Sequence, residues 1–431
     1  IILSLLFSRP AAEPQLILGG MLRHDWLAFT FRILFLTGAA ITSLFAMEIE
    51  SLGCRGEFYL SLVVSTFGMS LMAASADLIM LFLAIEATSI PLYVMAGFFT
   101  RDNKSTEAGF KYFLFGALTS AVMLYGFSLL FGFTGTTQIY QIADMVQMNQ
   151  IPNSILMGVA MLILVGFGFK IAAVPLHFWA PDVYEGAPTP VTGFLSTASK
   201  AAGFAVLMRF VLAVFPTTVP EWTVLLATMA TVTMILGNVL ALAQKNIKRI
   251  LAYSSIAQAG YILVGVAAIS PMGVASATYY LMAYLFTNMV AFGIISLVGR
   301  TVGSDDLSAY AGLSRRMPRV ALALLVAMLS LGGIPPFGGF IAKVLVFGAA
   351  VQANLIWLAV VGVLNSIVAL YYYLNILKVV YLYRSEEEAR PVFISRPWTV
   401  GIVVSVAGII LLGTLFSPWY SWAVTAASSL F

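Results

Sequence analysis

Four ionisable side chains lie inside segments that are otherwise apolar and long enough to cross a lipid bilayer. They are Glu86 in LFLAIEATSIPLY, Lys170 in GFGFKIAAVPLHF, Lys200 in FLSTASKAAGF and Lys343 in GGFIAKVLVF. A charge at the bilayer centre costs about 2.5–3.5 kcal/mol on insertion scales, so a chain keeps one only where the fold shelters it. A sheltered lysine also releases its proton more readily than an exposed one. We therefore interpret the three lysines as proton carriers and Glu86 as a proton-carrying counter-charge.

Other roles for these charges are weaker. Each residue lies near the middle of its segment, which argues against a side chain that reaches back to the interface. A static buried ion pair stays open, but a single glutamate leaves at least two lysines without a carboxylate partner from this chain. His177, just past Pro175, is a candidate relay because it titrates near neutral pH, with a structural hydrogen bond as the alternative. Asp182 and Glu185 are expected in a loop, where a solvated role is favoured over transport.

The composition is that of a membrane protein. Hydrophobic residues make up 61% of the 431 residues and charged residues only 9%, with a mean hydropathy of +0.98, far from that of a soluble domain. Cys54 is the only cysteine, which argues against a disulfide framework or a cysteine metal site. With two histidines, His24 and His177, haem and iron–sulfur ligation are also disfavoured. The chain is expected to move charge without a redox centre or metal of its own.

The elements that must hold these residues are membrane-spanning helices in a single membrane-embedded domain, 1–431. A span needs about 20 apolar residues, and about twelve can be placed. They are expected near 27–47, 57–76, 78–99, 108–133, 154–180, 188–215, 222–243, 249–269, 274–299, 319–350, 354–382 and 399–416. Residues 1–7, IILSLLF, are interpreted as the tail of a span that begins before this sequence, with a short re-entrant start as the alternative.

The loops between these spans differ in charge. With the spans above, the basic residues fall on one face: Arg101, Lys104, Lys111, Lys245, Lys248, Arg249, Arg300, Arg315, Arg316, Arg319, Arg384, Arg390 and Arg396. The opposite loops, 134–153, 216–221, 270–273 and 351–353, contain no Lys or Arg. The positive-inside rule makes the basic face cytoplasmic and places the carboxyl terminus outside.

Two parts of the chain resemble one another. Tyr112-Phe113-Leu114 in the fourth span recurs as Tyr279-Tyr280-Leu281 in the ninth. Each is followed by a span that contains proline, AAVPLHFW and GGIPPFGG, and the two broken spans start from opposite faces. Such a pattern predicts inverted repeats, 57–215 and 222–382, in which the broken helices mark the transport site.

Three segments then resemble a known family. KIAAVPLHFWAPDVYEGAPTPVTGFLSTASKAAGF, KNIKRILAYSSIAQAGY and LSLGGIPPFGGFIAKVLVF are similar to the N subunit (subunit 2) of proton-pumping NADH:quinone oxidoreductase, respiratory complex I. The resemblance extends over nearly the whole chain. It implies an all-α antiporter-like fold with two inverted five-helix repeats, broken helices seven and twelve, and a polar axis through the membrane. Fourteen spans are expected in this family, so the first and most of the second would precede this sequence.

The resemblance also implies roles for residues. The functional glutamate of helix five matches Glu86, and the lysines of helices seven, eight and twelve match Lys170, Lys200 and Lys343. Related subunits often have a histidine where this chain has Gln258, which puts a titrating role there in doubt. The implied mechanism is a change in the Glu86–Lys170 separation that passes protons through Lys200 to Lys343. The energy would come from quinone reduction elsewhere in the complex.

The expected setting follows from the same resemblance. NADH, FMN, iron–sulfur clusters and quinone would bind other subunits, and neighbouring antiporter-like subunits and the lipid bilayer would surround this one. The expected location is the bacterial inner membrane, with the thylakoid or mitochondrial inner membrane as alternatives. Three other functions stay open: a subunit of the photosynthetic ferredoxin–plastoquinone oxidoreductase, a subunit of a multisubunit cation/proton antiporter, and a scaffold with static charges.

Overall fold

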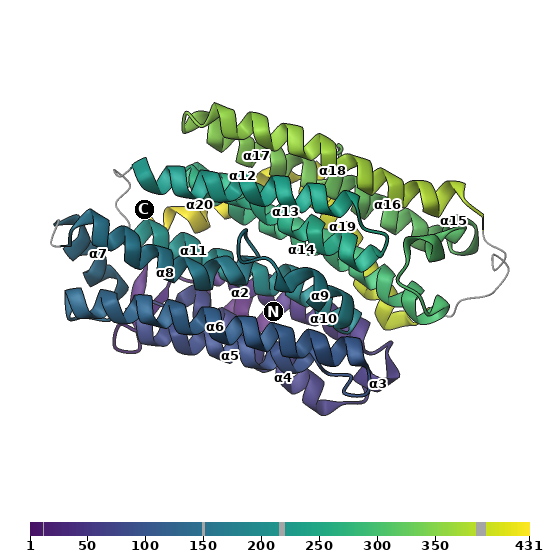
Figure 1. Ribbon diagram of the computed structural model, residues 1–431, viewed down its shortest axis with the longest axis horizontal. Coiled ribbons are helices and arrows are strands. Elements are labelled where there is room, and N and C mark those ends of the chain that lie inside the picture. Colours follow the sequence, from purple (N-terminus) through teal and green to yellow (C-terminus); the bar gives the residue numbers. More distant parts are fainter. Residues whose placement is uncertain (12, 149–150, 215–219, 385–393) are drawn as a thin grey trace.

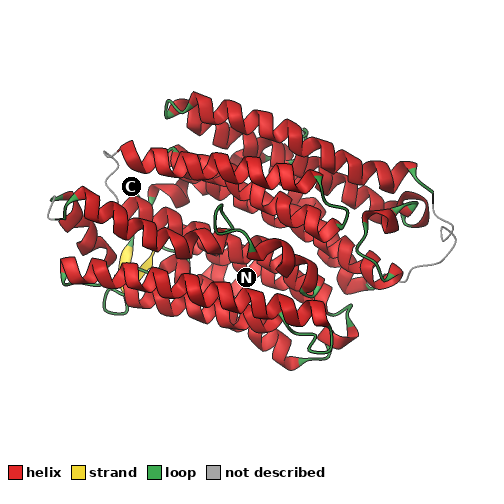
Figure 2. Cartoon of the chain, in the orientation of Figure 1, coloured by secondary structure: helices red, strands yellow, loops and turns green. Residues whose placement is uncertain are grey.

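Eleven helices in the described part of the chain are long and apolar enough to cross a membrane. A computed structural model describes residues 1–431 except 12, 149–150, 215–219 and 385–393. The long helices lie side by side in one elongated bundle (Figures 1 and 2). Their bounds are α2 (Trp26–Ala46), α4 (Gly56–Ala74), α5 (Leu78–Ala96), α6 (Asn103–Thr134), α8 (Asn153–Ile171), α10 to α11 (Thr189–Phe194, π-helical η1 Leu195–Ser199, Lys200–Val214), α12 (Pro220–Leu242), α13 (Ile247–Ala267), α14 (Pro271–Val302), α18 (Ile356–Leu382) and α19 (Arg396–Thr414).

Shorter elements complete the fold. They are α1 (Ile2–Phe7), strands β1 (Gln15–Ile17) and β2 (Leu22–His24), α3 (Glu50–Gly53), α7 (Ile139–Gln147), α9 (Trp179–Gly186), 3₁₀ helix η2 (Leu307–Tyr310), α15 (Leu313–Arg316), α16 (Pro318–Gly332), α17 (Gly338–Gln352) and α20 (Phe416–Ser428). The two strands form an antiparallel hairpin. A helix lies at each of the twelve expected spans; the span expected at 154–180 ends with α8 at Ile171, and the one expected at 319–350 is divided into α16 and α17.

Polar caps begin several of the long helices. The Asp77 side chain accepts hydrogen bonds from the backbone N–H of Ile79 and Met80 at 2.8 and 3.1 Å, which satisfies donors that have no partner inside α5. Asn246 caps α13 and Ser270 caps α14 in the same way. The starts of these helices are therefore determined locally.

Both expected helix breaks are present. Helix α8 ends at Ile171, and Ala172 has a φ of +56°, in the left-handed region that helices cannot continue through. Helix α16 ends at Gly332, and Gly333 has a φ of +81°. The bonds Val174–Pro175 and Pro335–Pro336 are cis. The helix α7 that precedes α8 and the helix α15 that precedes α16 lie at opposite ends of the bundle (Figure 1), so the two broken helices begin at opposite ends.

Several elements were not expected from the sequence. The loop expected at 134–153 contains α7, and both α20 and the β1–β2 hairpin lie outside the predicted spans. Helix α7 buries Ile139, Ile142, Ala143 and Val146 on one face. Helix α7 has nine residues, too few to cross a membrane, so it was not predicted as a span, although its apolar residues have helical spacing.

The basic loops lie at one end of the bundle, which we call the basic end. The connection before α13 pairs with the one before α15 through Asn246 and Asp306, and Gly312 N–H donates to the Tyr383 carbonyl at 3.0 Å. Arg390 and most of the loop 216–221 lie outside the described residues. The carboxyl terminus and α7 lie at the other end (Figure 1).

Candidate functional site

Glu86 and Lys170 approach one another across the interface of α5 and α8. Lys170 is the second-last residue of α8 and is 4% exposed. Its Nζ donates a hydrogen bond to Ser89 Oγ, one helical turn after Glu86 on α5. Glu86 Oε1 is buried and has no hydrogen-bond partner among the described residues. The Glu86 carboxylate acts on Lys170 electrostatically. The described residues contain no direct ion pair between the two, and the Lys170 ammonium donates to Ser89 instead.

Lys200 lies directly after the π-helical turn η1 and is 1% exposed. Its Nζ donates to the backbone carbonyl of Ser255 at 2.8 Å and to Ser255 Oγ at 2.6 Å. A π turn inside an α-helix is often found at functional sites, since it displaces the residues that follow. In the part of the chain that the structure describes, Lys200 has no carboxylate within ion-pair distance.

Lys343 occupies the second helix break. Its Nζ donates to the carbonyls of Leu331 at 2.9 Å and Gly332 at 3.2 Å, and to Ser366 Oγ at 2.7 Å. It also lies 5.0 Å from the centre of the Tyr261 ring. The last carbonyls of a helix have no helical donor and carry partial negative charge. The end of α16 therefore takes the place of a carboxylate counter-ion for this lysine.

Helix α13 connects the environments of Lys200 and Lys343. Ser255 bonds Lys200, and its neighbour Ser254 shares a hydrogen bond with the Tyr373 hydroxyl. Gln258 Nε2 donates to that hydroxyl at 3.1 Å and to the Leu331 carbonyl at 3.2 Å, the same carbonyl that Lys343 binds. Apart from the covalent step between the two serines, hydrogen bonds join the lysines continuously. Gln258 takes part as a fixed amide, since an amide does not titrate.

The packing of α11 on the end of α8 brings the Lys170 and Lys200 segments together. A Cβ added at Gly203 would lie 3.0 Å from Lys170 Cβ and 2.9 Å from Ile171 Cγ2. Because only glycine permits this approach, α11 packs directly on the end of α8, one turn after Lys200. Among the described residues no hydrogen bond joins Lys170 to Lys200.

His177 is buried in the first break, but the structure does not join it to the lysines. Its Nδ1 has no hydrogen-bond partner in the described part of the chain, and its ring lies 4.6 Å from that of Phe178. Its relay role stays a prediction. No group of three or more His, Cys, Asp or Glu among the described residues is placed to hold a metal ion.

Asp182 and Glu185 lie on helix α9, not in the loop where they were expected. The α9 turn follows directly from the break, so it continues the interrupted helix. Asp182 binds Lys111 at 2.6 Å and Arg249 at 2.9 Å, and Glu185 binds Lys104 and Arg249, both at 2.9 Å. Partial burial raises the pKa of Asp182, but the bonds from Lys111 and Arg249 outweigh it and lower that pKa overall. These ion pairs join α9 to α6 and α13 at the basic end and are separate from the buried lysines.

The sequence analysis missed a buried ion pair at the other end. Arg209 on α11 is 2% exposed, and its NH1 and NH2 bind the two oxygens of Asp25 at 2.7 and 2.9 Å. It also donates from Nε to the Ala73 carbonyl and from NH1 to the Tyr140 hydroxyl. The available signal was an arginine inside the apolar segment 188–215. Its partner lies 184 residues away in the sequence, where no spacing rule points to it.

The chain is similar to known proteins over most of its length. A family model described as NADH:quinone oxidoreductase/Mrp antiporter, TM, matches residues 75–369. The chain is 44% identical over 417 residues to a protein named NADH-quinone oxidoreductase subunit N from Moorella thermoacetica, an alignment that covers 96% of this chain and 87% of that protein.

Solved structures have the same fold. A chain of respiratory complex I from Thermus thermophilus with bound aureothin superposes with a TM-score of 0.82 at 36% identity, covering 97% of this chain and 90% of that one. A chain of the Mrp complex from Dietzia sp. DQ12-45-1b has a TM-score of 0.87 at 23% identity, covering 95% and 84%. The latter likeness concerns the fold alone.

Proposed function

Because this chain belongs to the family of NADH-quinone oxidoreductase subunit N, we propose that it is a proton-translocating membrane-arm subunit of that oxidoreductase. The family resemblance and the all-α antiporter-like fold expected from the sequence are confirmed. The chain is then part of a translocase that couples quinone reduction in other subunits to proton transfer in this one. NADH, FMN, iron–sulfur clusters and quinone are assigned to those other subunits.

The observation that carries the proposal is the set of three buried lysines with polar partners. Lys200 and Lys343 each donate to backbone carbonyls and serine hydroxyls and have no carboxylate partner among the described residues. An ammonium held this way can lose its proton without leaving a buried carboxylate unpaired. We assign Lys170, Lys200 and Lys343 as proton carriers and Glu86 as the group that sets the charge state of Lys170.

The proposed mechanism is electrostatic. Two unit charges 4 Å apart interact with about 4 kcal/mol at an effective dielectric constant of about 20. Movement of Glu86 relative to Lys170 by a few ångströms therefore changes the proton affinity of the lysine enough to alter its charge. Ser89, which holds the ammonium, keeps the two charges from forming a permanent pair.

The two expected repeats, 57–215 and 222–382, are part of this proposal. What supports them is that each contains one broken helix with a buried lysine, Lys170 at the first break and Lys343 at the second, and that the breaks are approached from opposite ends. Inverted repeats place such breaks at the membrane centre, around one transport site.

The setting in the cell is proposed as follows. The chain is a multi-pass membrane protein with neighbouring antiporter-like subunits in a multisubunit complex. We place the basic end in the cytoplasm, the carboxyl terminus outside and the whole chain in the bacterial inner membrane. The gathering of the basic loops at one end, opposite the carboxyl terminus, supports this orientation.

A role as a subunit of a multisubunit cation/proton antiporter is less favoured. The family model covers both oxidoreductase and Mrp antiporter proteins, so it does not separate them. The 44% identity to a subunit N, against 23% for the Mrp chain, favours the oxidoreductase.

The test is proton pumping in sealed membrane vesicles from cells that carry Lys200→Ala, with NADH oxidation measured in parallel and assembly examined on a native gel. Lys245→Ala is the matched control, because Lys245 is an exposed lysine at the basic end. If assembled Lys200→Ala complex loses pumping while the control retains it, the proposal holds. Normal pumping by the assembled Lys200→Ala complex would make the buried lysines structural.

A further inference from the structure

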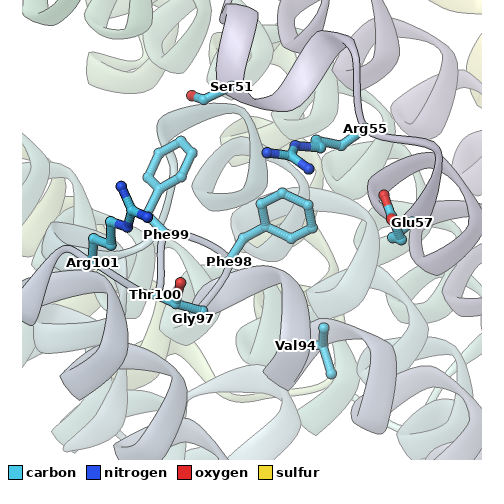
Figure 3. A pocket seen from close by; sticks show the side chains of 9 residues that line it. All are labelled: Ser51, Arg55, Glu57, Val94, Gly97, Phe98, Phe99, Thr100 and Arg101. Atoms are coloured by element: carbon cyan, nitrogen blue, oxygen red, sulfur yellow. The ribbon is translucent and has the colours of Figure 1, made fainter.

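A pocket at the basic end is separate from the buried lysines. It has a volume of about 730 Å³ and is lined by Ser51, Arg55, Glu57, Val94, Gly97, Phe98, Phe99, Thr100 and Arg101. These residues come from α3, the start of α4, the end of α5 and the connection to α6 (Figure 3). The proposed function uses none of them.

The two arginines in this pocket have no ion-pair partner in the described part of the chain. Arg55 and Arg101 are exposed, and no ion pair or side-chain hydrogen bond is present for either within the described residues, unlike Lys104, Lys111 and Arg249 at the same end. Of the described residues that line the pocket, Glu57 alone has a carboxylate. The lining therefore has a net charge of +1, which suits a monoanionic ligand.

The pocket walls are fixed by packing. The Phe98 ring contacts that of buried Phe58 edge-on, with ring centres 5.8 Å apart. Asp102 N–H donates to the Phe99 carbonyl at 2.9 Å. A Cβ at Gly97 would lie 3.3 Å from Gly109 Cα, so the end of α5 is held tightly against α6. In Figure 3 the Phe99 ring lies between the side chains of Arg101 and Arg55, and the Arg55 guanidinium lies beside the Phe98 ring.

One side of the pocket continues onto the apolar flank of the bundle. Val94 is 55% exposed, and Ile90 and Leu83 precede it on the same face of α5 with exposures of 57% and 56%. A ligand at the arginines would thus have an apolar surface running from it along the membrane. This combination of a cationic end and an apolar flank matches an amphiphile with an anionic head.

We propose that this pocket binds an anionic phospholipid of the leaflet at the basic end, with its headgroup at Arg55 and Arg101 and an acyl chain along Val94 and Ile90. One guanidinium group can donate two parallel hydrogen bonds to the oxygens of one phosphate, a geometry that an ammonium group lacks. The hydroxyls of Ser51 and Thr100 line the same space and are available to the glycerol part of the headgroup.

The experiment measures lipid binding to the full chain, purified in mild detergent, by native mass spectrometry. Phosphatidylglycerol and phosphatidylcholine with the same acyl chains are titrated separately. The Arg55→Gln/Arg101→Gln variant is compared with Lys245→Gln/Arg319→Gln, which removes two exposed charges from the basic end outside the pocket. Thermal unfolding of both variants verifies that they are folded.

We expect the pocket variant to bind phosphatidylglycerol about tenfold more weakly while the control changes less than twofold, with phosphatidylcholine binding unaffected. Arg55→Lys/Arg101→Lys should fall between wild type and the glutamine variant, because charge is kept and paired bonding is lost. Equal losses in the pocket and control variants would overturn the proposal, since binding would then follow net charge alone.

Two further outcomes identify another ligand. If glycerol phosphate competes as well as the intact lipid, the site binds free phosphates and the acyl chain plays no part. If the pocket variant binds phosphatidylglycerol normally but fails to assemble with its neighbouring subunits, the arginines bind an acidic protein segment. Either result would overturn the lipid assignment and leave the proton-translocation proposal untouched, because Lys200 and its partners lie elsewhere.

Discussion

The ammonium of Lys343 and the amide of Gln258 share one acceptor, the Leu331 carbonyl, at distances of 2.9 and 3.2 Å. Leu331 is the second-last residue of α16. In an unbroken helix its carbonyl would accept from the backbone four residues on. The break that follows Gly332 therefore creates the acceptor, so the proline-containing segment and the buried lysine form one functional unit.

Substitution of Lys343 by arginine should separate charge from proton transfer. Arginine keeps the positive charge at the end of α16 but does not release its proton in the accessible pH range. We expect Lys343→Arg to assemble on a native gel and to lose proton pumping. Lys343→Met should also lose stability, by about 1–3 kcal/mol, because the Gly332 carbonyl is left without the lysine donor. Pumping by the arginine variant at the wild-type rate would contradict a carrier role.

Removal of the Ser255 hydroxyl should weaken the path without breaking it. In Ser255→Ala, Lys200 loses its bond to Oγ and keeps the one to the backbone carbonyl. A single hydrogen bond to a charged group contributes about 1.5–3 kcal/mol, so we expect pumping to fall roughly tenfold in vesicle assays. Ser276→Ala is the control, because among the described residues that buried hydroxyl bonds only to the Met272 carbonyl of its own helix. Equal effects of the two variants would argue against a specific role.

Glu86 and Lys170 should behave as a coupled pair. We expect Glu86→Gln and Lys170→Ala each to reduce pumping strongly, and the double variant to be little worse than Lys170→Ala alone. The physical reason is that Glu86 acts through its charge on that lysine, so its loss matters less once the lysine is gone. Pumping rates of the assembled wild-type complex, the two single variants and the double variant give the coupling between Glu86 and Lys170. Additive losses would show that the two residues act independently.

Arg209 should be structural. Arg209→Ala removes both hydrogen bonds that Arg209 donates to the buried Asp25 carboxylate and leaves it with a longer contact to Arg23 Nε at 3.4 Å. Breaking a buried pair in this way costs about 3–5 kcal/mol. We expect a clear drop in the thermal unfolding midpoint of the purified protein. The Arg209→Met/Asp25→Asn double variant should recover much of it, since the two fully buried charges of the pair are then both absent. An unchanged midpoint in Arg209→Ala would refute this role.

The basic end should lose stability in acid. The pKa values of Asp182 and Glu185 are lowered on folding: burial raises them, but bonds from Lys111, Lys104 and Arg249 outweigh that effect. A carboxyl with a lowered folded pKa stabilises the protein above its unfolded pKa, and this contribution disappears as the pH falls through the folded value.

The measurement is the unfolding midpoint from pH 7 to pH 3. We expect a plateau above about pH 5 and a decline below about pH 4, near the ordinary pKa values of these carboxyl groups. In Asp182→Asn/Glu185→Gln the decline should be shallower and the plateau lower. The same acid slope in both proteins would assign the effect to other carboxyl groups.

Much of the architecture could be predicted from the sequence because the bilayer imposes simple local rules. A span must be apolar over its length, so the segments around Glu86, Lys170, Lys200 and Lys343 were recognisable and their four charges stood out against them. The breaks were recognisable as well, because in two spans proline, which removes a backbone donor, stands close to a buried lysine. Pro91, which has no lysine beside it, lies inside the continuous helix α5. Helix α7 was missed because nine residues cannot span a membrane.

The partners of the charges were decided by the tertiary structure. Nothing in the sequence indicates that Ser89 binds Lys170, that Ser255 binds Lys200, or that Asp25 neutralises Arg209. Residue type and local spacing determine where a helix runs and which charges it buries. The hydrogen bonds that stabilise those charges join helices distant in sequence, and only the packing of those helices determines which acceptors face each buried charge.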